Sequence, residues 1–305
     1  MGHKMGICQH SLSVGLFASL LLVDAAPALG GLMVSTIGTP FRIDFDAFRG
    51  RGLMPNPMAS QLDSNHWRIS GLSDGPGRFG GTHDSGDFAR GPSSGGVTTG
   101  GVYGFNVASS GEPNWTLGFQ PIGSDLTPGA ATLMVTNATG AVVDRLELDY
   151  DIWLLNNGDR SSSIRFAYSM DDENYETLDR LSIATALEAD TNAGWEAVGR
   201  ATVLSALNLA EGSSIFLQWW MDDVGGRGSR DEWSLDQIEM TWGDSPVSTV
   251  PEPSSWMLLA FLCPATLWRR RRNVVRSTNA STLKPVTRAI RKKMLAAVEP
   301  ITLEQ

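Results

Sequence analysis

The hydrophobic and polar residues between positions 41 and 242 follow a period of two. Apolar and polar side chains alternate over 42–46, 144–152 and 163–168, and clusters of Gly, Asn, Asp and Ser separate these runs. Alternation of this kind puts one set of side chains in a core and the other in solvent, as in a half-buried antiparallel strand. Recurring short strands between turn residues predict an all-β sandwich or barrel.

Three other segments add to this pattern. Residues 215–220 form a nearly continuous apolar run of strand length, which predicts a central strand. Neighbouring residues of a strand point to opposite faces, so Trp219 and Trp220 must lie on opposite sides, one in a core and the other in a second layer or exposed as a platform for sugar rings. We expect one helical turn at 203–209 and a long glycine-rich loop at 71–101, at one end of the sandwich.

The body of the chain, residues 31–250, is acidic and free of lysine. It holds 13 arginines and 29 acidic residues, a formal charge of −16, whereas residues 251–305 hold 10 basic and 3 acidic residues. Nucleic-acid binding rests on clustered Lys and Arg, so this composition argues against a nucleic-acid partner. Cys8 and Cys263 lie outside the body, which therefore has no disulfide, no thiolate nucleophile and no cysteine-based zinc site.

The N-terminal residues have the pattern of an export signal. Lys4 precedes an apolar run over 14–23, and Ala26-Pro27-Ala28 matches the small-x-small pattern that a signal peptidase accepts. We therefore predict a cleaved signal peptide over 1–28 and a linker over 29–40. The body would then lie outside the cytoplasm.

A second targeting pattern follows a linker over 243–253. Its parts are Pro251, Glu252 and Pro253, the apolar residues 254–268, and Arg269, Arg270, Arg271 and Arg272. As a helix the apolar stretch would be about 22 Å long, shorter than the roughly 30 Å hydrocarbon core, so it would span only a thinned bilayer. The arginines would hold a basic tail, 269–305, in the cytoplasm by the positive-inside rule.

Proline-glutamate-proline, a short apolar helix and an arginine cluster in this order resemble the PEP-CTERM sorting signal of bacterial exported proteins. The resemblance covers residues 250–272. It implies that a membrane-embedded exosortase recognises Pro251-Glu252-Pro253, removes the helix, and passes an inner-membrane precursor to the cell surface or the extracellular polysaccharide matrix. The chain departs from the family in continuing for 33 residues beyond Arg272.

Several short motifs are spread through the body. They are Ile43-Asp44-Phe45, Thr99-Gly100-Gly101-Val102-Tyr103-Gly104-Phe105, Leu117-Gly118, residues 217–223 and Leu235-Asp236. Together they resemble the motifs of a β-sandwich domain of exported bacterial proteins that is similar to jelly-roll carbohydrate-binding modules and has no assigned catalytic residues. This resemblance implies a jelly-roll-like antiparallel β-sandwich over 41–242. Gln237 stands where those domains have a second Asp.

An acidic ladder is the candidate catalytic group. Glu147, Asp149 and Asp151 alternate along one predicted strand and share a face. In jelly-roll glycoside hydrolases an E-x-D-x-x-E strand carries nucleophile and acid, so the ladder is a candidate retaining glycosidase site. The third carboxylate would fall at position 152, which is Ile152, and the solvated face of an antiparallel strand accounts for the ladder equally well.

A second acidic group surrounds the glycine-rich loop 225–228. It consists of Asp222, Asp223, Asp231, Glu232 and Asp236, and Asp44 and Asp46 of the first strand would face the last strand in a closed jelly roll. Oxygen ligands on a turn suit calcium, so Asp44, Asp46, Asp222, Asp223 and Asp236 are the candidate ligands of a structural calcium ion. The alternative is a solvated acidic loop. The ladder strand is expected to lie elsewhere.

These patterns predict an exported, non-enzymatic β-sandwich protein of the cell surface or extracellular matrix, without a cofactor other than a structural calcium. Two alternatives remain open. One is a carbohydrate-binding module for exopolysaccharide, favoured by the tryptophans and acidic loops. The other is a jelly-roll glycoside hydrolase, which Ile152 disfavours.

Overall fold

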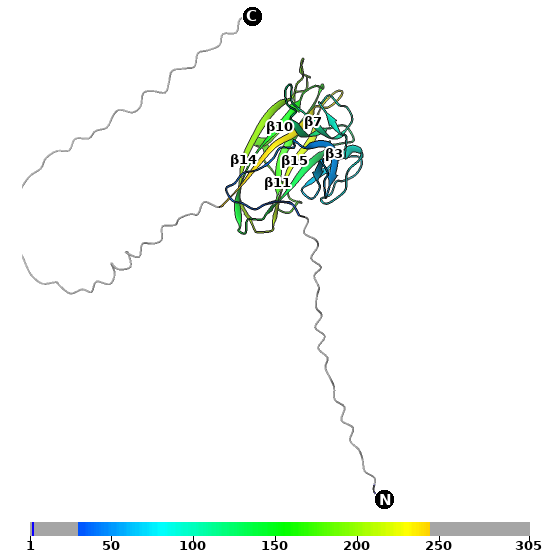
Figure 1. Ribbon diagram of the computed structural model, residues 1–305. Coiled ribbons are helices and arrows are strands. Elements are labelled where there is room, and N and C mark those ends of the chain that lie inside the picture. The colour runs from blue at the N-terminus through cyan, green and yellow to red at the C-terminus, as the bar shows by residue number, and fades with distance from the viewer. Residues whose placement is uncertain (1, 3–29, 245–305) are drawn as a thin grey trace, which may run out of the picture. The chain divides into compact units, whose positions relative to one another are not determined.

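A computed structural model describes Gly2 and residues 30–244 of the chain (Figure 1). Residues 30–244 form 16 β-strands and two single-turn 3-10 helices, η1 (Gly86–Phe88) and η2 (Asp179–Leu181), which confirms the predicted all-β class. The predicted signal peptide, the sorting motif with its arginines, the apolar segment 254–268 and the basic tail lie outside the described residues. Among the described residues, no helix is long and apolar enough to cross a membrane.

Two seven-stranded sheets make up the sandwich. Sheet A contains, in order, β1 (Leu32–Val34), β9 (Gly129–Asn137), β15 (Ser214–Gly226), β11 (Arg160–Ser169) and β12 (Glu176–Thr177), with β5 (Trp67–Ser70) paired to β9 and β13 (Ile183–Ala184) paired to β11. Sheet B contains β14 (Glu196–Leu209), β10 (Val143–Leu155), β16 (Glu232–Gly243), β8 (Trp115–Gln120), β7 (Gly101–Asn106) and β6 (Pro92–Ser93), with β2 (Phe41–Ile43) paired to β16. A separate ribbon joins β3 (Phe48–Met54) and β4 (Ser60–Asp63).

The long strands alternate between the two sheets along the chain. Strands β9, β11 and β15 belong to sheet A, and β10, β14 and β16 belong to sheet B, so each connection crosses the sandwich. Within each sheet the long strands pair antiparallel. Two sheets joined by crossing connections are the arrangement of a jelly roll. The jelly-roll-like antiparallel sandwich predicted from the sequence is therefore the fold.

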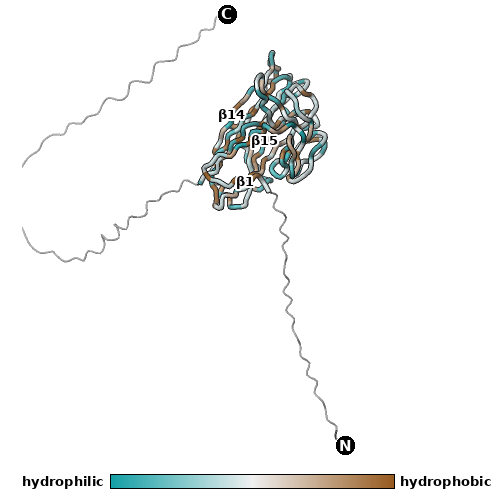
Figure 2. Tube along the Cα trace, in the orientation of Figure 1, coloured by the Kyte–Doolittle hydropathy of each residue, from teal (hydrophilic) through white to brown (hydrophobic). Residues whose placement is uncertain are grey.

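The three longest alternating or apolar runs are strands, as predicted. Residues 144–152 lie in β10, 163–168 in β11 and 215–220 in β15, which is central in sheet A. Figure 2 shows hydrophobic and hydrophilic segments interleaved through the folded part of the chain. The sheet also begins earlier than expected, because β1 lies within the stretch 29–40 that the sequence predicted as linker and pairs with β9.

Two local expectations were wrong. The helical turn expected at 203–209 is the end of β14, where the pairing of Leu204 with Leu146 of β10 outweighs local helix preference. The alternating run 42–46 stops being a strand after β2, because Phe45 has a positive φ of 56° and turns its ring into the core. The stretch 71–101 is mostly loop, as expected, but it is anchored by the buried side chains of Leu72 and Phe88.

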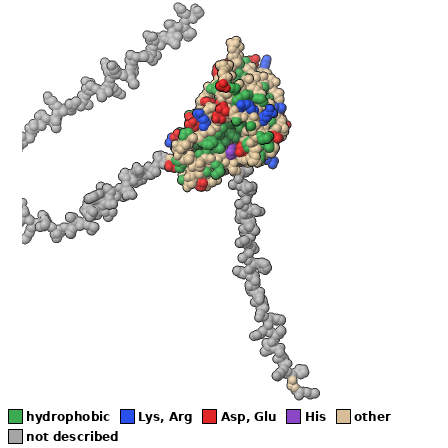
Figure 3. Space-filling view, viewed as in Figure 1, with side chains coloured by type: hydrophobic (Ala, Val, Ile, Leu, Met, Phe, Trp, Pro, Cys, Tyr) green, Lys and Arg blue, Asp and Glu red, His purple; other side chains and the backbone are tan. Residues whose placement is uncertain are grey.

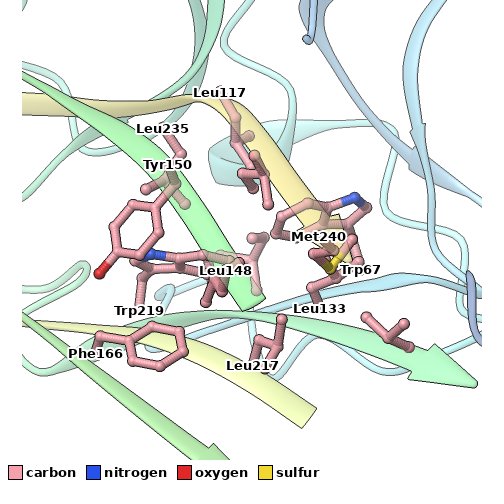
Figure 4. Close-up of a cluster of buried hydrophobic side chains, with 14 of the residues drawn as sticks. Trp67, Leu117, Leu133, Leu148, Tyr150, Phe166, Leu217, Trp219, Leu235 and Met240 are labelled. Atoms are coloured by element: carbon pink, nitrogen blue, oxygen red, sulfur yellow. The ribbon is translucent and has the colours of Figure 1, made fainter. Parts of the chain in front are cut away.

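Aromatic rings fill the centre of the sandwich around Trp219, which has no exposed surface (Figure 4). Trp67 of β5 stacks on it with ring centroids 6.0 Å apart, and Tyr150 of β10 meets it edge-on at 5.4 Å. Phe166 of β11 makes a second edge contact at 5.6 Å. Each such ring removes on the order of 150 to 250 Å² from water, so this cluster joins both sheets. The prediction that Trp219 and Trp220 face opposite ways is confirmed, because Trp220 is partly exposed.

The two neighbouring tryptophans allow a direct test of this core. We expect Trp219→Ala to lower the free energy of unfolding by about 3–5 kcal/mol, because it removes a fully buried ring and leaves a cavity. Trp220→Ala, the matched control on the same strand, should cost far less. Urea unfolding of both variants followed by circular dichroism checks this. Equal losses would contradict the placement of Trp219 in the core and Trp220 outside it.

Candidate functional site

The outer side of sheet A carries a row of partly exposed aromatic and planar polar side chains. Because Leu217, Trp219 and Met221 of β15 fill the core, the residues between them point outward. We call this surface the tryptophan face and define it as Arg68, Phe79, Arg165, Phe216, Gln218 and Trp220. The cross-strand register places Arg165 of β11 opposite Trp220, and Thr132 of β9 opposite Gln218.

The ring of Trp220 is held by its cross-strand neighbour. The Arg165 guanidinium carbon lies 4.7 Å from the Trp220 ring centroid, a cation–π distance. On the next outward position, the Gln218 side-chain amide donates to Thr132 Oγ1 at 3.2 Å. These contacts hold the indole ring of Trp220 and the amide of Gln218 in fixed orientations on the surface.

The far end of the tryptophan face is built from three separate segments. Phe79 and Phe216 lie with ring centroids 6.0 Å apart, and the Arg68 guanidinium stands 4.8 Å from the Phe79 centroid. Arg68 donates two hydrogen bonds to the Asp172 carboxylate, at 2.6 and 2.7 Å, and the Tyr175 hydroxyl donates to the same carboxylate at 2.6 Å. The bidentate pair ties the β11–β12 loop to β5, and it neutralises the Arg68 charge.

This arrangement can bind a flat ligand that is apolar on its faces and polar at its edge. Aromatic rings offer apolar contact, and guanidinium and amide groups offer in-plane hydrogen bonds. In one view of the surface, hydrophobic side chains gather in the middle with basic and acidic side chains around them (Figure 3). The aromatic–amide–aromatic order on β15, Phe216, Gln218 and Trp220, runs along the strand.

The acidic ladder lies on the outer side of sheet B, and it is not separate from Asp236. On β16, Glu239 pairs with Asp149, and Asp236 pairs with Asp151. The structure therefore brings together two acidic groups that the sequence analysis placed apart. Burial, and then the charges of Glu239 and Glu147, raise the pKa of Asp149.

The E-x-D-x-x-E pattern of a glycoside hydrolase strand is incomplete on β10. Ile152, at the position of the third carboxylate, has no exposed surface and belongs to the core. Asp236 is also fully buried, and its carboxylate accepts hydrogen bonds from the Asn114 side-chain amide at 3.1 Å and from the Gln237 backbone N–H at 2.8 Å. A carboxyl group without exposed surface cannot contact a glycosidic oxygen.

The structure does not bring all five predicted calcium ligands together. Asp44 and Asp46 lie in the loop after β2, and Asp46 lies close enough to Asp236 of β16 to help raise its pKa, whereas Asp222 and Asp223 lie near the end of β15 in sheet A. This is a correction of the predicted cluster, and its reason is that β15 and β16, although consecutive, belong to different sheets. Across residues 30–244, no three His, Cys, Asp or Glu residues are grouped so that they could hold a metal ion.

Most carboxylates around the 225–228 loop have protein partners instead. Asp223 accepts hydrogen bonds from Arg160 at 2.7 and 2.5 Å and from Arg230 at 3.1 Å. The fully buried Glu232 accepts the backbone N–H groups of Gly96 and Val97 at 2.7 and 2.6 Å. Asp223 thus holds two arginines and Glu232 anchors the 93–97 loop.

Sequence reasoning identified Trp220 and missed most of the tryptophan face. Arg68 and Asp172 are 104 residues apart, and Phe79 comes from the glycine-rich loop predicted at 71–101. None of the three belongs to a recognisable motif. The predicted sorting residues, Pro251 to Pro253 and Arg269 to Arg272, lie outside the described residues.

Comparisons with known proteins find likeness of fold only. No family model matches the chain, and no curated protein matches it. Among solved structures, the xylan-binding module CBM15 is 8% identical, with a TM-score of 0.34 over 68% of this chain and 99% of that one. TmCBM61 in complex with β-1,4-galactotriose is 12% identical, with a TM-score of 0.26 over 45% and 75%. The module CBM28, described as specific for non-crystalline cellulose, is 9% identical, with a TM-score of 0.29 over 48% and 82%.

The buried carboxyl of Asp236 predicts a pH-dependent stability difference. Burial raises its pKa from 3.8 to about 6, so the folded protein takes up this proton at a higher pH than the unfolded chain does. The destabilising charge is absent below about pH 4 and fully present above about pH 6. Asp236→Asn, which keeps an acceptor for the Gln237 N–H, should therefore exceed the wild type in stability at pH 7–8 by roughly 2–3 kcal/mol.

That advantage should shrink as the pH falls from 6 to 4. Urea unfolding of both proteins across this range measures it. Glu147→Gln, at a partly exposed ladder position, is the control and should show no comparable trend. An Asp236→Asn advantage that stays constant with pH would rule out titration of Asp236 as its source.

Proposed function

We propose that this chain is an exported, non-enzymatic β-sandwich protein that binds a polysaccharide through the tryptophan face. The observation that carries the proposal is Trp220, a large ring kept partly exposed beside Arg165 on the outer side of sheet A. Phe216 lies in line with it on the same strand, about 13 Å away by strand geometry. The two rings are far enough apart to contact different sugar units of one linear chain.

The chemistry of the face supports a sugar ligand. The faces of a pyranose ring are lined with C–H groups, and its rim carries hydroxyl groups that both donate and accept hydrogen bonds. Aromatic rings suit the former, and the Arg165 guanidinium and the Gln218 amide suit the latter. Because the Arg68–Asp172 pair and Phe79 already order one end of the face, little conformational entropy is lost on binding.

Net charge narrows the class of polysaccharide. The body, residues 31–250, has a formal charge of −16, and Arg68 is neutralised by Asp172. Electrostatic repulsion from the whole domain disfavours polymers that are rich in uronate or sulfate. A chain of neutral sugars is the ligand class that we propose.

The place of action rests on the terminal sequence patterns. A signal peptide over 1–28 would export the body, and Pro251-Glu252-Pro253 with residues 254–272 would present an inner-membrane precursor to an exosortase-type enzyme. Processing would release the body to the cell surface or the extracellular matrix, where polysaccharide is the abundant ligand. No metal or organic cofactor is part of this proposal.

Loss of the Trp220 ring should weaken polysaccharide binding. We expect Trp220→Ala to lower the affinity for a soluble neutral polysaccharide at least tenfold, because the ring supplies the apolar contact of the face. Affinity electrophoresis in gels containing xylan, a β-glucan or the producer's own exopolysaccharide measures this. Val203→Ala removes an exposed side chain from sheet B and should bind as the wild type does. A wild-type protein retarded by none of these polymers would refute the proposed function.

Processing can be tested independently of binding. Mass spectrometry of protein extracted from the cell surface should find a C-terminus close to Pro253. Replacing Arg269 to Arg272 with Ser should impair membrane retention of the precursor, because the apolar segment is short for a bilayer. Mature surface protein that still carries Trp268 would contradict the sorting proposal and leave the binding proposal standing.

A further inference from the structure

A pocket of about 410 Å³ lies on the outer side of sheet B. Its walls come from Arg42 of β2, Asp149 and Asp151 of β10, Arg200 of β14, and Gln237 and Glu239 of β16, with Tyr150, Gly199 and Ala201 completing the lining. The volume falls within the range of roughly 300–1,000 Å³ that is typical of small-molecule sites. The pocket shares no residue with the tryptophan face, which lies on the other sheet.

The pocket is hollow because of two local features of the strands. Strand β14 contributes Gly199 and Ala201, whose side chains are too small to fill the space. Strand β16 contains a bulge at Gln237, which has a positive φ of 49°, where the register with β10 shifts between Asp149 and Asp151. A Cβ built on Gly199 would already lie 3.4 Å from Asp151 Oδ1, so a larger side chain there would extend into the pocket.

Carboxylates and one guanidinium group line the pocket. Three carboxylates, Asp149, Asp151 and Glu239, line the pocket together with Arg42, which forms an ion pair with Glu239 at 3.5 Å. Arg200 lies opposite the core residue Tyr150 and donates to the backbone carbonyl of Leu181 at 3.2 Å, so it belongs to the edge of the pocket and not to its charged wall. A sugar with two neighbouring hydroxyl groups can donate one hydrogen bond to a carboxylate and accept another from an arginine. The excess of carboxylates disfavours a ligand that itself carries a carboxylate.

An aromatic surface adjoins this polar pocket. Trp153 follows Asp151 by two residues on β10, so the two side chains share a face and stand about 7 Å apart. Trp153 and Trp195 are partly exposed and pack against the buried residues Tyr103, Phe105 and Val107. Sheet B therefore has partly exposed aromatic rings near the polar pocket, as sheet A has aromatic rings beside polar groups on the tryptophan face.

We propose that this pocket is a second saccharide site, and that the protein joins two polysaccharide chains. The inference rests on the proposed function. The pocket takes one pyranose unit that has neighbouring hydroxyl groups and no carboxylate, such as a chain end or a branch, whereas the tryptophan face takes the length of a chain. Because the two sites lie on the outer sides of two stacked sheets about 10 Å apart, they point away from each other and can be occupied together.

Filling the pocket should separate cross-linking from binding. Gly199→Leu adds bulk at a position without a positive φ, and Asp151→Ala removes a polar wall. Both variants should keep their affinity for a soluble neutral polysaccharide within about twofold, measured by affinity electrophoresis, because the tryptophan face is intact. Both should lose at least tenfold of the turbidity that the wild type produces when it is mixed with that polysaccharide. Val203→Ala, on the same strand as Gly199, should behave as the wild type in both assays.

Short oligosaccharides report on the pocket alone. Trp220→Ala should still bind a neutral di- or trisaccharide in isothermal titration calorimetry, and Gly199→Leu combined with Trp220→Ala should not. Parallel titrations with a neutral oligosaccharide, a deacetylated amino-sugar oligosaccharide and an oligouronate show which of these classes of sugar the pocket binds. Preferential binding of the oligouronate at the pocket would overturn the assigned ligand class.

The outcomes distinguish this inference from the proposed function. A wild-type protein that binds polysaccharide without cross-linking it, or a Gly199→Leu variant that cross-links as the wild type does, would overturn the second site and leave the tryptophan face in place. Retention of full polysaccharide affinity in Trp220→Ala, with its loss in Gly199→Leu, would instead move the binding site to the pocket and refute the tryptophan face.

Discussion

The burial of Trp219 between the two sheets is the constraint on which the other features depend. Its ring contacts aromatic side chains from β5, β10 and β11, so it joins sheet A to sheet B. Since successive residues of a strand point to opposite faces, burying Trp219 forces Trp220 and Gln218 outward. A shift of one residue in the register of β15 would move its core residues to the surface and its surface residues into the core. The register of this one strand therefore sets both the hydrophobic core and the tryptophan face.

The crossing connections of the sandwich decide which charged residues meet. Residues near the end of β15 and the start of β16 are close in sequence, yet the two strands lie in different sheets. Asp223 is therefore paired with Arg160, while Asp236 lies beside Asp151 on sheet B. The buried carboxylates anchor neighbouring segments through hydrogen bonds. Glu232 accepts hydrogen bonds from two backbone N–H groups of a loop, and Asp236 accepts one from the side chain of Asn114. Burial raises the pKa of both carboxyl groups.

Two saccharide sites on opposite sheets would suit a protein of a polysaccharide matrix. The tryptophan face offers rings along a strand, and the sheet B pocket offers carboxylates and the Arg42 guanidinium around a small hollow. The acidic, lysine-free body would limit non-specific attraction to polyanions and leave specific contact with neutral sugars as the source of affinity. Weak individual sites gain strength when one polymer offers many binding units, because later contacts form at high effective concentration.

The sequence by itself determined the all-β class, the positions of β10, β11 and β15, and the opposite orientation of Trp219 and Trp220, because the period of apolar residues is a local property of the chain. It also contained both terminal sorting patterns. Only the tertiary structure decided that Asp236 meets Asp151, that residues 203–209 are strand, and that Arg68 finds Asp172. Those outcomes depend on which strands become neighbours and in what register. They are set by the burial of the whole core, which no short stretch of sequence contains.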